Sequence, residues 1–199
     1  MGGVKRNELA LQSKVTNDHL KGAIDTLANV IRTIHLKRAL TRVDPDPHLN
    51  FWRVVYGNLL DMAVIEWCKL FGSDNEDYQQ VHWKNVFQDA RAFRSGLYRH
   101  LGIDGKTFLM YWKLMKAYRD THAAHLDFDK PRISHYPTFD YAIASSYYYY
   151  MQLIPGMRKR GIMRYPDDLT TYGEAFFVQA GDIAARAILA TKNVDECLG

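Results

Sequence analysis

Apolar residues recur at steps of three and four along nearly every long segment of the chain, a spacing typical of amphipathic helices. The first such segment runs from about Asn7 to Leu40, and the Asp-Pro-Asp-Pro sequence at 44–47 ends it. A second runs from about Pro47 to Phe71, with Asp46 as its expected N-terminal cap. The polar stretch Gly-Ser-Asp-Asn at 72–75 marks the end of this second helix.

Four further segments have the same period. They run from Trp83 or Asn85 to Leu101, from about Asp104 to His125 or Leu126, from a Thr138 cap to about Ile154 before Pro155-Gly156, and from Asp167 or Asp168 to about Thr191. The apolar face expected for the last helix comprises Phe177, Ala180, Ile183, Ala187 and Ile188. No β-alternation of useful length and no linker composition are visible. The pattern therefore predicts one all-α domain over residues 1–199, an antiparallel bundle of five to six helices.

Candidate chemistry gathers in one stretch, KAYRDTHAAHLDFDKPR at 116–132. On an ideal helix, Arg119 and His122 continue the apolar stripe of Met115, which places them at the end of the inward face. Arg119 and His125 would then lie about 9 Å apart along the axis and about 120° apart around it. Arginine is rarely buried without a partner, so Arg119 is the most informative of these residues.

The spacing Arg119-Asp120-x4-His125 resembles the R-x4–6-H motif of HEPN domains, which are small all-α bundles, many of them metal-independent ribonucleases. The longer string YRDTHAAHLD, at 118–127, is most similar to the abortive-infection branch of that superfamily. The resemblance implies a homodimer in which two motif helices form a composite site, and a toxin or phage-defence role with RNA as substrate and a possible cognate antitoxin.

The residue types suit this chemistry. In RNA cleavage without metal, the ribose 2′-hydroxyl attacks the adjacent phosphate, which requires a proton acceptor and stabilisation of the developing charge. Histidine exchanges protons near neutral pH, and the planar guanidinium of arginine binds two phosphate oxygens at once. We therefore assign His125 as acid and base, Arg119 as phosphate clamp, Asp120 as the residue that orients one of them, and His122 as an accessory residue.

Other interpretations of the same stretch stay open. Arg119 and the carboxylates can form ordinary helix-end ion pairs, and positive histidines are favourable at a helix C-terminus. His122, His125, Asp127 and Asp129 could together bind a metal, although no second ligand helix is evident. In the first case the chain would be a non-catalytic helical interaction or nucleotide-binding module. In the second case it would carry a metal site instead of a metal-independent ribonuclease site.

Two further clusters have both a functional and a structural interpretation. The basic sequence MRKRGIMR, at 157–164, could contact a phosphate backbone, but a solvated loop is the simpler interpretation. The four tyrosines at 147–150 could stack on bases, but consecutive helical residues point all round the helix, which favours core or dimer packing.

Composition narrows the function classes. The chain of 199 residues carries 26 Lys and Arg against 22 Asp and Glu, a formal charge of +4 that permits an anionic partner without requiring one. Its two cysteines, Cys68 and Cys197, are expected to be free thiols. Neither a signal peptide nor a membrane span is expected, which predicts a cytoplasmic location. Phosphate-binding glycine loops and a His-Glu-x-x-His motif are absent, and no cofactor is expected.

Overall fold

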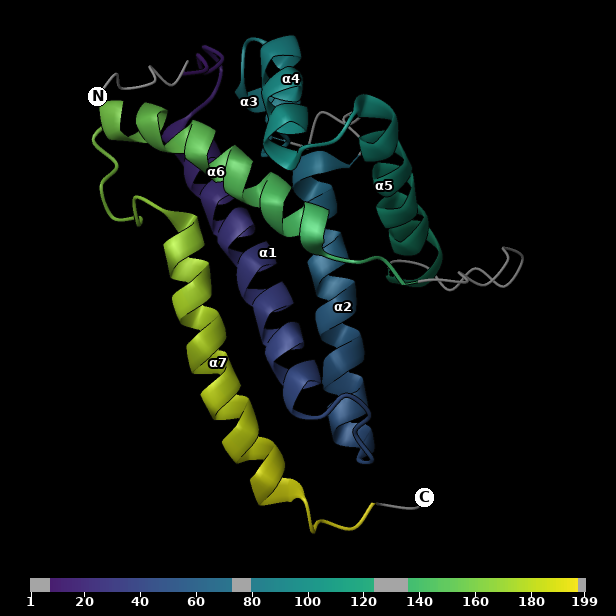
Figure 1. Cartoon of the computed structure of the whole chain (residues 1–199). Coiled ribbons are helices and arrows are strands. Elements are labelled where there is room, and N and C mark those ends of the chain that lie inside the picture. The colour runs from purple at the N-terminus through teal and green to yellow at the C-terminus, as the bar shows by residue number, and fades with distance from the viewer. Residues whose placement is uncertain (1–7, 73–79, 124–135, 197–199) are drawn as a thin grey trace.

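The computed structural model describes residues 8–72, 80–123 and 136–196 (Figure 1). Within these ranges the chain forms seven α-helices, one π-helical turn and no strand, so the predicted all-α bundle is confirmed. The elements are α1 (Asn17–Val43), α2 (Asn50–Phe71), α3 (Trp83–Val86), α4 (Ala90–Leu101), α5 (Gly105–Tyr118), the π-helical turn η1 (Arg119–Ala123), α6 (Asp140–Lys159) and α7 (Leu169–Thr191).

The long helix α1 is the centre of the fold and packs against α2, α6 and α7. Figure 1 shows α2 antiparallel to α1, whereas α7 lies on the other side of α1 and runs in the same direction as α1. Helix α6 crosses α1 and α2, α4 packs on α6, and α5 packs on α2. The end of α5 therefore lies beside α2, where the motif residues 119–123 meet the bundle.

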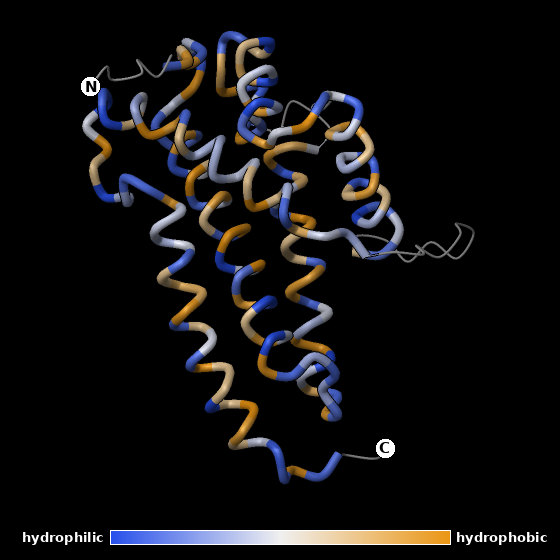
Figure 2. The backbone as a smooth tube through the Cα atoms, viewed as in Figure 1, coloured by the Kyte–Doolittle hydropathy of each residue, from blue (hydrophilic) through white to orange (hydrophobic). Residues whose placement is uncertain are grey.

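The core forms where these helices meet. Helix α1 has completely buried residues at helical spacing, namely Leu20, Leu27, Val30, Ile31 and Ile34. The backbone trace in Figure 2 shows hydrophobic residues recurring along α1, α2 and α7. Because burial of one large aliphatic side chain stabilises a fold by about 1.5–3 kcal/mol, this stripe makes α1 the main organiser of the bundle.

The four tyrosines of α6 belong to this core. Tyr148, Tyr149 and Tyr150 are buried, and Tyr147 is half-buried. The Tyr149 hydroxyl donates to the carbonyl of Val81 at 2.8 Å, and the Tyr150 hydroxyl to that of Pro166 at 2.6 Å. The structure thus agrees with core packing for these residues.

Several predicted helix starts are wrong. Helix α1 starts at Asn17, ten residues after the predicted position, because Thr16 and His19 form a capping box there. The preceding residues instead pair with the segment after α3: Leu11 forms a β-bridge with Phe87. This contact also divides the predicted helix from Trp83 to Leu101 into α3 and α4, with Asp89 capping α4. The described residues therefore form seven helices, where the sequence predicted five to six.

The caps predicted for the next helices differ as well. Helix α2 starts at Asn50 with Leu49 at the cap position and no capping side chain, so Asp46 does not cap it. Phe139, not Thr138, precedes α6. The Thr138 carbonyl accepts a hydrogen bond from the Tyr111 hydroxyl at 3.0 Å, which ties this segment to α5.

Helix α6 continues through Pro155 to Lys159, beyond the predicted end at Ile154. A proline inside a helix removes one backbone hydrogen bond. The continuation buries Met157, and Gly156 lies so close to Leu11 that a Cβ there would come within 2.6 Å of its Cδ1. Packing on the N-terminal segment thus accounts for a helical turn that the local sequence disfavours.

The buried face of α7 agrees with the predicted one except at Ile183. Ala180 and Ala184 are buried against the bundle, whereas the side chain of Ile183 is 60% exposed. The small alanines fit the close approach of α7 to α1. Phe177 also reaches α1, where its ring lies 5.5 Å from the ring of His35.

Candidate functional site at the end of α5

Helix α5 starts at an Asp104 cap, whose carboxylate accepts from the Thr107 backbone N–H at 2.8 Å. Met115 and Tyr118 are buried on its inner face. The predicted helix continued to residue 125 or 126, but the α-helical pattern ends at Tyr118 and a π-helical turn follows over Arg119–Ala123. π-Helical turns are rare and occur frequently at functional sites. The candidate motif begins at this turn.

Arg119 and Asp120 form an ion pair at the start of the turn. One carboxylate oxygen of Asp120 accepts from the Arg119 Nε at 2.7 Å and from its Nη2 at 2.5 Å. The Arg119 side chain is 24% exposed and the Asp120 side chain 40%. Asp120 thus holds the guanidinium in a partly solvent-accessible position, which agrees with both the orienting role and the ordinary ion-pair interpretation.

Tyr118 fixes this turn to α2. Its hydroxyl donates to Oδ1 of Asp61 at 2.7 Å. Burial, together with the Asp61 hydrogen bond and charge, raises the pKa of Tyr118 well above its usual range, so the hydroxyl stays protonated as a donor. Within the turn, the Thr121 hydroxyl donates to the Ala117 carbonyl at 2.7 Å.

His122 does not lie on the inward face, contrary to the ideal-helix geometry. Its side chain is exposed, and its ring lies 5.4 Å from the Tyr118 ring. Because a π-helical turn is wider than an α-helical turn, residues after Arg119 are rotated relative to the apolar stripe of α5. His125, Asp127 and Asp129 lie outside the described residues. Of the predicted site, the structure therefore pairs Arg119 with Asp120 and places His122 beside Tyr118.

Cys68 on α2 is buried close to the charges of this turn. Burial raises the pKa of the Cys68 thiol to about 12, a shift on which Arg119, Asp120 and Lys116 act in opposing directions. The thiol is therefore neutral at physiological pH, and a neutral thiol is a poor nucleophile. Cys68 accordingly acts as a small apolar residue of the core beneath the motif.

A pocket of about 700 Å³ adjoins the motif turn through Tyr118. Its lining residues come from α1, from α2, and from the segment that precedes α6: Lys37, Arg38, Thr41, Arg42, Tyr56, Gly57, Leu60, Asp61, Tyr118, Tyr136, Pro137 and Phe139. The lining thus contains three cationic side chains, one carboxylate and several aromatic rings. The volume falls within the range of about 300–1,000 Å³ typical of small-molecule sites.

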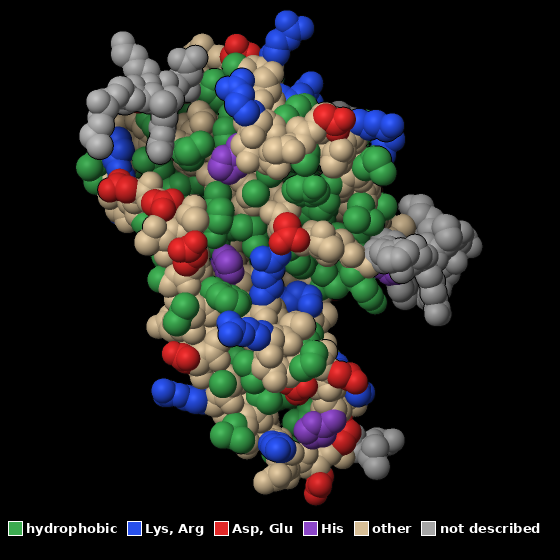
Figure 3. All heavy atoms as spheres, in the orientation of Figure 1, with side chains coloured by type: hydrophobic (Ala, Val, Ile, Leu, Met, Phe, Trp, Pro, Cys, Tyr) green, Lys and Arg blue, Asp and Glu red, His purple; other side chains and the backbone are tan. Residues whose placement is uncertain are grey.

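Sequence reasoning did not find this pocket because its residues come from three segments that are distant along the chain. The signal that could have indicated it is the basic spacing Lys37, Arg38 and Arg42 at the end of α1. On the face shown in Figure 3, Lys and Arg side chains gather over α1, below α6.

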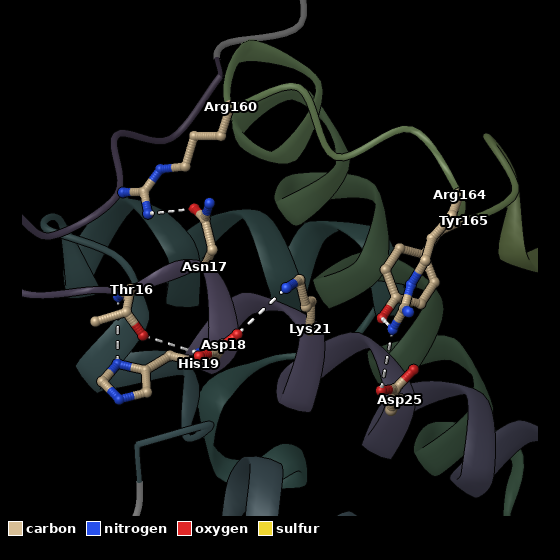
Figure 4. Close-up of polar contacts among 9 residues, drawn as sticks. All are labelled: Thr16, Asn17, Asp18, His19, Lys21, Asp25, Arg160, Arg164 and Tyr165. Atoms are coloured by element: carbon tan, nitrogen blue, oxygen red, sulfur yellow. Dashed lines mark hydrogen bonds and ion pairs between the residues drawn. The ribbon is translucent and has the colours of Figure 1, made fainter.

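The basic cluster at 157–164 lies elsewhere and is engaged in contacts within the chain. Arg158 binds Asp167 at 2.6 Å and the Tyr165 carbonyl at 2.6 Å, and Lys159 pairs with Glu8. Figure 4 shows Arg160 directed to Asn17 on α1, and Arg164 beside Tyr165 and Asp25. These contacts fix the α6–α7 connection to α1 and to the N-terminal segment, and residues 157–159 belong to α6, so the cluster is not the solvated loop that the sequence favoured.

No family model, curated protein or solved structure matches this chain. In the described part of the chain, no helix combines the length and the apolar character that crossing a bilayer requires. Residues 8–72, 80–123 and 136–196 also contain no group of three or more His, Cys, Asp or Glu arranged to hold a metal ion. The resemblance to HEPN domains therefore rests on the motif residues.

Proposed function

We propose that the protein is a metal-independent endoribonuclease of a toxin or phage-defence system, active in the cytoplasm as a homodimer. The ribose 2′-hydroxyl attacks the adjacent phosphorus and the bond to the 5′-oxygen breaks, which leaves a 2′,3′-cyclic phosphate and a 5′-hydroxyl. No cofactor takes part. The observation that carries the proposal is the Arg119–Asp120 pair, held on a π-helical turn beside a cationic and aromatic pocket.

Each residue has a role in this reaction. Arg119 binds the non-bridging phosphate oxygens and stabilises the pentavalent state, because its guanidinium stays charged throughout. Asp120 orients that guanidinium through the two contacts to one carboxylate oxygen. His125 accepts the 2′-hydroxyl proton and protonates the leaving oxygen. His122, exposed beside Tyr118, is an accessory residue that contacts the substrate backbone.

The homodimer and the defence role follow from the resemblance of the motif to HEPN domains. In such a dimer, Arg119 of one subunit acts with His125 of the other subunit in one cleft. A ribonuclease toxin is controlled by a cognate antitoxin, which we include as a partner. The net charge of +4 supports an anionic substrate such as RNA.

A non-catalytic helical interaction or nucleotide-binding module is the second candidate. It is favoured by one observation: Asp120 already neutralises Arg119 within the turn, so the pair is satisfied without a substrate. In that case Arg119 stabilises the end of α5 and does not act on RNA.

Cleavage of labelled transfer and messenger RNA by the purified protein separates the two candidates. The ribonuclease proposal predicts that Arg119→Ala and His125→Ala each lower the cleavage rate by about 100-fold or more. Lys113→Gln is a matched control because it removes an exposed cation from the same helix outside the motif. If folded wild-type protein does not cleave RNA, or if both variants retain full activity, the non-catalytic module is the better account.

A further inference from the structure

The pocket beside the motif turn has features that the cleavage chemistry does not use. Tyr136 lines its mouth and is 72% exposed. The Tyr136 ring lies 6.1 Å from the buried ring of Tyr118 at an interplanar angle of 61°. A solvent-exposed aromatic ring beside a fixed one offers a stacking surface for a planar group, and each base–aromatic stack is worth about 1–3 kcal/mol.

Three cationic side chains of α1, those of Lys37, Arg38 and Arg42, line the same pocket. Lys37 lies 5.9 Å from the centre of the Tyr56 ring, and burial lowers the pKa of Lys37. Arg38 is paired with Asp140 at 2.7 Å, whereas Arg42 is exposed and forms no ion pair within the described part of the chain. Two cations thus face the pocket without a carboxylate partner among these residues. A phosphate group is the complementary ligand chemistry.

Tyr56 of α2, which also lines the pocket, is fixed to the end of α1. The Tyr56 hydroxyl donates to the Leu40 carbonyl at 2.8 Å and to the Asp44 carbonyl at 2.7 Å. The Thr41 hydroxyl oxygen is buried in the lining of the same pocket without a hydrogen bond to any described residue.

We infer that this pocket binds one nucleotide unit, with its base on the exposed ring of Tyr136 and its phosphate on Lys37 and Arg42. Asp61 accepts from Tyr118 and offers a carboxylate to the ligand, which favours a base with adjacent N–H donors, as guanine has, over uracil. The assignment of the nucleotide to an RNA substrate rests on the proposed function, but nucleotide binding does not. The pocket would then select the nucleotide next to the cleaved phosphate.

Calorimetric titration with guanosine 5′-monophosphate, guanosine and inorganic phosphate tests the site directly. We expect the monophosphate to bind at least about tenfold more tightly than guanosine or phosphate alone, because it contacts both the aromatic and the cationic residues of the pocket. Uridine 5′-monophosphate should bind more weakly than the guanosine nucleotide. Equal affinity for guanosine monophosphate and inorganic phosphate would mean simple anion binding and would overturn the inference.

Two exposed residues allow variants that should fold normally. Arg42→Gln should lower the affinity for guanosine monophosphate about tenfold and leave the affinity for guanosine unchanged, because it removes a phosphate contact. Tyr136→Ala should lower the affinities for guanosine monophosphate and for guanosine about tenfold, because the base loses its stacking surface. Lys113→Gln, an exposed cation outside the pocket, should change neither. Unchanged monophosphate affinity in both pocket variants also overturns the inference.

The RNA assay then separates this inference from the proposed function. If the nucleotide belongs to the substrate, guanosine monophosphate competes with RNA, and Arg42→Gln raises KM for RNA more than it lowers kcat. Nucleotide binding without competition identifies a free nucleotide as the ligand and rules out the RNA assignment. Nucleotide binding without any RNA cleavage overturns the proposed function alone. Conversely, RNA cleavage without nucleotide binding overturns this inference alone.

Discussion

The Tyr118 hydroxyl donates a hydrogen bond to Oδ1 of Asp61 at 2.7 Å, and this bond joins the last residue of α5 to the middle of α2. Arg119 follows immediately, so the contact determines where the motif turn starts relative to the bundle. The same two residues also line the pocket. One hydrogen bond thus couples the position of the candidate site to the shape of the cavity beside it.

Tyr118→Phe removes this hydrogen bond while the buried ring is retained. We expect the free energy of unfolding to fall by about 1 kcal/mol, because Asp61 loses its donor. Urea denaturation monitored by circular dichroism measures the change. Tyr136→Phe is the control, since the exposed Tyr136 hydroxyl makes no hydrogen bond to a described residue. Equal effects of the two substitutions would contradict a specific role for the Tyr118–Asp61 bond.

A composite dimer site predicts complementation between two inactive variants. A heterodimer of Arg119→Ala with His125→Ala contains one site with both an intact arginine and an intact histidine. Random re-association of equal amounts of the two variants should restore about a quarter of the wild-type activity. Half of the dimers are then heterodimers, and each heterodimer has one of its two sites intact. RNA cleavage after mixing and refolding measures the recovery. A mixture that stays inactive, although wild-type protein treated in the same way recovers, indicates that each site lies within one subunit.

The contact between α7 and α1 depends on Gly173. A Cβ there would lie 2.5 Å from the Tyr147 hydroxyl and 2.9 Å from the Ile31 Cγ2. Gly173→Ala should therefore lower the stability by about 1–3 kcal/mol through overpacking. Gly181→Ala on the same helix meets nothing within 4 Å and should raise the stability by up to about 1 kcal/mol, because alanine favours helices. Thermal denaturation of both variants measures these changes in stability. Changes of the same sign in the two variants would contradict the close packing of α7 at Gly173.

His35 should make the stability depend on pH. Burial and then the Arg38 charge lower the pKa of His35, and its Nε2 lies 3.1 Å from the Tyr147 hydroxyl, which Glu174 also influences. Because the unfolded chain binds a proton near pH 6.5 and the folded chain does so only at lower pH, stability falls as the pH drops below about 6.5. Above that pH the His35 contribution is constant.

The matched variant for this prediction is His35→Gln, which has no titrating side chain. Urea denaturation at pH 7.5 and pH 5 should show a smaller loss of stability in the variant than in wild-type protein. Burial lowers the pKa of His100 as well, but this contribution is common to both proteins and cancels in the comparison. An identical loss in the two proteins would mean that His35 does not couple folding to pH.

The fold class could be predicted because it depends on local periodicity, which α1, α2 and α7 show over many turns. The elements that depend on distant contacts could not. The segment before the Thr16 cap pairs with a distant one through Leu11 and Phe87, and the continuation of α6 past Pro155 depends on the contact of Leu11 with Gly156. Neither contact leaves a periodic signal in the sequence.

The candidate site was predictable only in part, for a similar reason. The motif spacing identified Arg119 and Asp120, which the structure pairs. The π-helical turn then places His122 outside the inward stripe, because one widened turn changes the register of every residue that follows. The pocket was not predictable from local pattern, since Lys37, Asp61 and Tyr136 meet only in the folded chain.

Identification of the RNA ends produced in the presence of EDTA tests the central claim most directly. The proposed reaction predicts cleavage by the wild-type protein that leaves 2′,3′-cyclic phosphate and 5′-hydroxyl ends, detected by mass spectrometry. Arg119→Ala should abolish these products while the Lys113→Gln protein still makes them. Products with 3′-hydroxyl ends, or cleavage only after a divalent metal replaces the chelator, would contradict attack by the 2′-hydroxyl at a metal-independent site.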